Sequence, residues 1–97
     1  MPKFRHRKVK REHAVLPAIE QGLARLAESD AIDAIIPGPI HRKSGGAIGW
    51  SVQYETAAGV KLLAPSPGAV QEVFVVSRDP QAVIRFAAES GLITHQD

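Results

Sequence analysis

The sequence contains no cysteine. A disulfide framework, a thiolate zinc site and a cysteine nucleophile are therefore all excluded. The chain also has no apolar run approaching the roughly 18 residues that cross a membrane. Its first residues are basic and lack the apolar stretch of a signal peptide. We therefore expect a cytoplasmic protein that makes no membrane contact.

Short motifs of enzymatic chemistry are also missing. The sequence shows no phosphate-binding loop, no dinucleotide glycine fingerprint, no nucleophile elbow and no pair of acids placed to face each other. The proline-rich and glycine-rich stretches 37–39 and 65–68 have the composition of turns. The sequence leaves catalysis open but favours a binding protein over an enzyme.

Positive charge is concentrated at one end of the chain. Residues 1–11 hold six Lys or Arg and no acid, whereas residues 12–97 hold six basic and ten acidic residues, a net charge of −4. Any nucleic-acid or other polyanion interface must therefore depend on this basic N-terminal arm, residues 1–11, chiefly on residues 3–11. The alternative is a solvated tail. The candidate phosphate contacts are Arg5, Arg7, Lys8, Lys10 and Arg11.

A helix is predicted from about His13 to Glu28. One apolar stripe at spacings of four, four and three residues supports it, formed by Val15, Ile19, Leu23 and Leu26. Proline is tolerated only in the first helical turn, so Pro17 prevents a start much before His13. The arm is expected to be extended. A second helix is predicted to begin at Asp79-Pro80 and to stop at Gly91.

The region between the helices reads as four short strands. Pro37-Gly38-Pro39 interrupts the first, at 32–40, and marks it as an edge strand or a bulged one. Strand 50–55 alternates, which places Trp50 and Tyr54 on the core face. The returning strand is 60–64, and strand 70–77 is apolar on both faces, as in the middle of a sheet. Turns are predicted at 43–46, 56–59 and 65–68.

The order α-β-β-β-β-α predicts an α+β fold, a two-layer sandwich in which two helices cover one face of a mostly antiparallel sheet of about four strands. We expect residues 12–97 to form a single domain after the arm. Because the last strand is apolar on both faces, the far face is expected to be closed in part by a second copy, as a homodimer, or by the arm.

Glu72 is the acid whose placement needs an explanation. On strict alternation it shares a face with Val70, Phe74 and Val76. A partly buried carboxylate needs a cation, which can be a metal ion or a basic side chain such as Lys61 on the adjacent strand.

Four histidines are the remaining soft ligands: His6, His13, His41 and His95. No two have the helical spacing of a paired site. If the arm folds back, His6 and His13 can meet, and Glu12 would complete an N2O set for a divalent metal, with zinc the first choice. Each histidine can equally be a surface residue. His41 adjoins Arg42 and Lys43 at the predicted first hairpin, which is either an anion-binding patch or a charged loop.

Two stretches carry a family resemblance. Residues 8–13, KVKREH, and residues 61–76, KLLAPSPGAVQEVFVV, resemble a small prokaryotic family of unknown function described as predicted metal-binding proteins. Lengths and element order are also similar. The resemblance implies a small divalent-metal-binding protein. His13 and Glu72 are the residues within the matching stretches that are able to ligate a metal.

Overall fold

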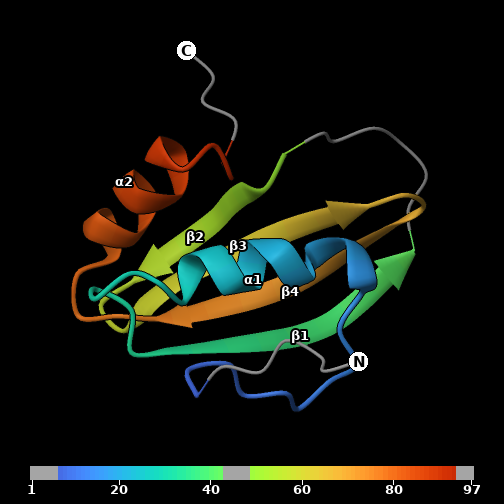
Figure 1. Ribbon diagram of the computed structural model, residues 1–97, viewed down its shortest axis with the longest axis horizontal. Coiled ribbons are helices and arrows are strands. Elements are labelled where there is room, and N and C mark those ends of the chain that lie inside the picture. The colour runs from blue at the N-terminus through green and yellow to red at the C-terminus, as the bar shows by residue number, and fades with distance from the viewer. Residues whose placement is uncertain (1–6, 43–48, 94–97) are drawn as a thin grey trace.

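The computed structural model describes residues 7–42 and 49–93 and confirms the predicted α+β element order. Figure 1 shows one sheet with two helices on the same side of it. The elements are the 3-10 helix η1 (Pro17–Ile19), α1 (Glu20–Leu26), β1 (Ala34–Arg42), β2 (Ser51–Thr56), β3 (Gly59–Ser66), β4 (Ala69–Val76) and α2 (Pro80–Glu89). No helix in the described parts of the chain is long and apolar enough to cross a membrane.

The four strands lie in the order β1-β4-β3-β2, and every neighbouring pair is antiparallel. Strand β4 is an inner strand, as its unbroken apolar run predicted. Strand β1 is at an edge of the sheet, as predicted. Pro37 and Pro39 have no N–H, so a strand that contains them cannot hydrogen-bond fully to neighbouring strands on both sides. The predicted first hairpin is wrong, because β1 and β2 occupy opposite edges. Its turn residues, 43–46, lie outside the described residues.

The first helix begins later than predicted. Residues 13–16 are not helical, η1 starts at Pro17, and α1 ends at Leu26 rather than Glu28. Leu16 is extended, with φ −64° and ψ 131°, because the ring of Pro17 disfavours a helical residue before it. The predicted apolar stripe is nevertheless correct. Ile19, Leu23 and Leu26 are fully buried, and Val15 packs against the same core.

Tyr54 is not in the core, contrary to the prediction. The register shifts between Val52, which pairs with Leu62, and Tyr54, which pairs with Lys61. This bulge turns Tyr54 onto the face away from the helices, where it is 47% exposed. Trp50 precedes the bulge and is buried, as predicted.

The second helix and its ends are as predicted. The Asp79 carboxylate accepts a hydrogen bond from the Ala82 N–H at 3.2 Å, and Pro80 is the first helical residue. Gly91, with a φ of 78°, follows the helix and takes the left-handed conformation that ends it. The predicted turns between β2 and β3 and between β3 and β4 are both two residues long.

The described end of the arm is extended and lies along the outer edge of β1. The Lys10 N–H donates to the Ile35 carbonyl at 2.8 Å, and the Ile35 N–H donates to the Lys8 carbonyl at 2.7 Å. Val9, between them, is buried and belongs to the core. Residues 8–10 therefore extend the sheet and do not cover its far face.

Gly22 fixes the distance between α1 and Trp50. A Cβ at this position would overlap the indole ring. Alanine normally stabilises a helix interior relative to glycine by about 1 kcal/mol. A loss of stability in the Gly22→Ala variant would therefore indicate the contact with Trp50. We expect Gly22→Ala to destabilise the fold by about 1–3 kcal/mol because the buried indole must move. Urea unfolding measures it, with Gln21→Ala on the exposed face of α1 as a control that changes stability by less than about 0.5 kcal/mol. A stabilising Gly22→Ala would contradict the packing.

Candidate functional site

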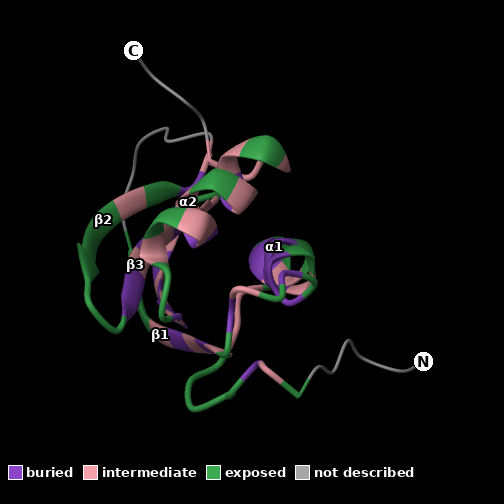
Figure 2. Cartoon of the chain, turned by 90° about the vertical axis from the view of Figure 1, so that its left-hand side faces the viewer, coloured by how far each residue is buried: buried purple, intermediate pink, exposed green. Residues whose placement is uncertain are grey.

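The face of the sheet opposite the helices is called the open face here. Along β4, buried residues alternate with partly exposed ones. The buried set points toward the helices and comprises Ala69, Gln71, Val73 and Val75, while the set on the open face comprises Val70, Glu72, Phe74 and Val76. This is the predicted register of Glu72, and Figure 2 shows both helices on the other side of the sheet.

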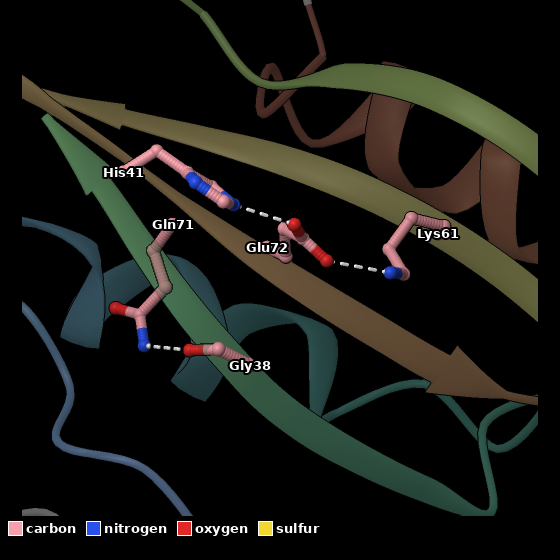
Figure 3. A network of polar contacts seen from close by, with 5 residues as sticks. All are labelled: Gly38, His41, Lys61, Gln71 and Glu72. Carbon is pink, nitrogen blue, oxygen red and sulfur yellow. Dashed lines mark hydrogen bonds and ion pairs between the residues drawn. The ribbon is translucent and has the colours of Figure 1, made fainter. Parts of the chain in front are cut away.

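Glu72 contacts two side chains on its neighbouring strands. The Lys61 ammonium, on β3, donates to Oε1 at 2.7 Å, as predicted. His41, on β1, places Nε2 2.6 Å from Oε2. In Figure 3 the two side chains reach the carboxylate from opposite sides. An ionised carboxylate only accepts, so the imidazole is the donor in this contact.

The position of His41 depends on an irregularity in β1. Pro37 pairs with Val73, but the next pair in the ladder is Ile40 with Gln71, so two residues of β1 lie opposite Glu72. His41, after this bulge, pairs with Val70 and therefore lies on the open face. Sequence reasoning treated His41 as part of a basic loop and missed its contact with Glu72. The Pro-Gly-Pro triplet predicted a bulge in this strand. It did not predict how many residues the bulge contains, which decides the face on which His41 lies.

Electrostatics hold the centre of the network ionised. The hydrogen bond from Lys61, followed by that from His41, lowers the pKa of Glu72 below its usual value. The hydrogen bond to Glu72 raises the pKa of Lys61, against a smaller opposite effect of burial. The Lys61 and Glu72 side chains are 19% and 21% exposed, whereas His41 is 49% exposed. Lys61 also lies 5.6 Å from the ring centroid of Tyr54, a cation–π contact.

Gln71 supports the same network from the helix side. Its side chain is fully buried, and its Oε1 accepts from the Leu16 N–H at 3.0 Å. Its Nε2 donates to the carbonyl of Ala14 at 2.8 Å. It also donates to the carbonyl of Gly38 at 3.0 Å, the contact drawn in Figure 3. One amide thus fixes both the segment before η1 and the bulge of β1. Because that bulge places His41, Gln71 positions the site without touching its open side.

The predicted metal ligands are placed as follows. Glu12 and His13 are exposed in the segment before η1, and Glu72 is in the network on the open face. His6 and His95 lie outside the described residues. Within 7–42 and 49–93, no three His, Cys, Asp or Glu side chains are grouped so that they could hold a metal ion. The described chain therefore offers at most a pair of ligands in one place, and His41 with Glu72 is such a pair.

The predicted polyanion contacts fall into three groups. Lys8 donates to the Ser29 carbonyl at 2.7 Å, and Arg11 makes a two-point ion pair with Glu20 at 3.0 and 3.1 Å. The other described members are Arg7, Lys10 and Arg42, and all three are exposed, as is Arg11. The members outside the described residues are Arg5 and Lys43.

The ion pair gives stability a defined pH dependence. Because the folded pKa of Glu72 is lowered, its contribution is complete above the ordinary value of 4.5 and is lost as the pH falls through the folded value. The contribution of Lys61, whose pKa is raised, is lost only as the pH rises beyond 10.5. We expect Glu72→Gln to lower stability by about 1 kcal/mol at neutral pH, with the difference vanishing in acid.

Urea unfolding across the pH range measures this effect. The matched control is Glu89→Gln, an exposed acid on α2, which should change stability by less than about 0.5 kcal/mol. A difference between wild type and Glu72→Gln that persists at the acidic end would show that packing, not charge, accounts for the loss.

Comparison with known proteins adds one finding. The sequence profile of the DUF2103 family, described as predicted metal-binding proteins, matches residues 4–85. This match includes the end of the arm, α1, the whole sheet and the first part of α2. No curated protein and no solved structure matches the chain at a significant level. The chain therefore belongs to the DUF2103 family of predicted metal-binding proteins.

Proposed function

We propose that this protein binds a divalent metal ion through His41 and Glu72. The observation that carries the proposal is the 2.6 Å contact between His41 Nε2 and Glu72 Oε2. An imidazole nitrogen and a carboxylate oxygen are ligands that zinc and its neighbours accept in proteins. A metal ion would take the place of the proton that now lies between these two atoms. Membership of a family described as metal-binding supports this assignment.

The surroundings of the pair suit reversible binding. Glu72 is on an inner strand, so its backbone is fixed, while His41 is half exposed and its ring can move to admit an ion. Lys61 keeps the carboxylate ionised through the other oxygen. Its ammonium also repels a nearby cation, so the affinity is limited by Lys61. Zinc is the first choice of metal because both ligands are of types it uses.

The ligand set predicted from the arm is a second proposal for the same function. Glu12 and His13 are exposed and therefore accessible to a metal ion from solution. They would act with His6, which lies outside the described residues. The two proposals differ in their residues, so matched variants distinguish them.

Zinc and nickel titrations of metal-stripped, tag-free protein by calorimetry test the proposal. We expect His41→Ala to weaken binding at least tenfold, because it removes one of two ligands from the chain. Lys61→Met should strengthen binding severalfold by removing the repelling charge. Protonation of the imidazole should abolish binding, since an imidazolium has no lone pair for a metal.

The matched control is the double variant Glu12→Gln, His13→Ala, which should keep full affinity. If this variant and His6→Ala lose binding while His41→Ala keeps it, the metal site is in the arm. If stripped wild-type protein takes up neither metal, the proposed function is wrong.

Polyanion binding is the alternative function, and the exposure of Arg7, Lys10 and Arg42 favours it. Deleting the arm would be a poor test because Val9 is in the core and Lys8 holds Ser29. We expect Arg5→Ala, Arg7→Ala and Lys10→Ala combined to lower the slope of log affinity for duplex DNA against log salt by roughly 3. Filter binding over a salt series measures it, with Arg85→Ala on α2 as the control. Unchanged affinity and slope would remove the alternative.

A cytoplasmic location fits either function, and it stays a prediction.

A further inference from the structure

The open face carries an apolar surface that the described helices do not cover. Both helices pack on the opposite face (Figure 2), and residues 8–10 lie along the edge of β1. Several apolar side chains on this face are only partly buried, and Tyr54 is 47% exposed. The partly buried ones are Ile36, Leu63, Val70, Phe74 and Val76.

The charged network extends from the middle of this surface to the edge strand β1, where His41 is the next-to-last residue. Glu72 is the fourth of eight residues in β4, and Lys61 is the third of eight in β3. These two strands are the inner pair of the sheet. Within β4, Val70 precedes Glu72 and Phe74 follows it on the same face, so apolar side chains flank the carboxylate along the strand.

The ligand pair is incomplete in one chain. A structural zinc site takes four ligands, whereas His41 and Glu72 supply two. The parts of the chain that the structure describes contain no group of three. In a two-fold symmetric dimer, each residue of an interface meets the same surface on its partner, so ligands close to the axis are doubled. A two-fold axis that passes beside His41 and Glu72 would bring the pairs of both copies together.

We propose that two copies of this chain pack open face against open face about a two-fold axis, with one metal ion held by His41 and Glu72 of both copies. This inference rests on the proposed function. It gives a site with two imidazole nitrogens and two carboxylate oxygens, the N/O set that zinc accepts.

Charge on the open face is compatible with a second copy. Each face brings one Lys61 ammonium for each Glu72 carboxylate, so the two faces do not repel through net charge. With one divalent ion at the axis, the two carboxylates face that ion and two ammoniums, so the metal-loaded centre carries a net charge of +2. Each Lys61 keeps the second oxygen of its own Glu72 as a partner.

The size of the face makes the dimer depend on the metal. Four strands about 4.8 Å apart and eight residues of about 3.3 Å give a face of roughly 500 Å² per copy. Stable interfaces bury roughly 800 Å² per partner. Apolar contact alone is therefore insufficient, and the bonds to the metal supply what is missing.

Sedimentation equilibrium of the metal-stripped full chain, with and without zinc, tests the inference alongside the calorimetric stoichiometry. We expect the 10.4 kDa mass of the monomer without zinc, a doubled mass with zinc, and one zinc per two chains. Tyr54→Arg places a cation on the open face at an exposed position beside Lys61, and it should lower the dimer population at least tenfold. Val76→Lys should do the same near the end of the face. The control is Gln81→Arg, which adds the same charge on α2 and leaves the dimer intact.

The outcomes separate the two proposals. One zinc per chain in a protein that stays monomeric overturns the dimer and leaves the proposed function standing. If neither zinc nor nickel binds, both proposals are wrong. A dimer of equal strength with and without zinc overturns the shared metal site. A zinc-dependent dimer that survives Tyr54→Arg and Val76→Lys but is lost in His13→Ala assigns the interface to the arm and also overturns the inference.

Discussion

Two adjacent polar residues on an inner strand set the constraints that the rest of this structure meets. In a strand, consecutive side chains point to opposite faces, so Gln71 and Glu72 cannot share a partner. Gln71 enters the core, where an unpaired amide would cost about 1–3 kcal/mol. Leu16, Ala14 and Gly38 satisfy it. One buried amide thus holds both the extended chain before η1 and the bulge of β1 in place.

Glu72 imposes the complementary constraint on the open face. A carboxylate with 21% of its side chain exposed is partly desolvated and needs positive charge nearby. Lys61 meets most of that need, because its hydrogen bond is the largest of the effects that lower the pKa of Glu72. His41 makes a smaller contribution to the ionised state of Glu72. A second, more exposed partner on the far oxygen is better explained by a role in binding, and this reasoning favours the metal pair over a purely structural network.

The sequence predicted those features that depend on short-range rules. The alternation of side chains predicted that Glu72 lies on the open face, with Lys61 as a candidate partner. The prolines of β1 predicted an edge strand or a bulged one. The capping residues predicted both ends of α2. The incorrect predictions have a different cause. The start of α1 depended on the residue before Pro17 and on a hydrogen bond from a residue 55 positions away. Tyr54 and His41 depended on bulges, and a shift of one residue moves a side chain to the opposite face. Such shifts are decided by pairing across the sheet, which local patterns do not record.

The same network explains why an interface on the open face should be conditional. Covering Lys61 and Glu72 with a second copy removes their remaining water, and desolvating an ion pair can cost more than its attraction returns. Apolar neighbours such as Phe74 and Val70 offset part of that cost, but the face is small. A divalent ion changes the balance because it replaces lost hydration with direct bonds to nitrogen and oxygen. In the proposed dimer, the charged centre would oppose assembly without metal and favour it with metal. The imidazole of β1 and the carboxylate of β4 would be the ligands, and the ammonium of β3 would limit the affinity.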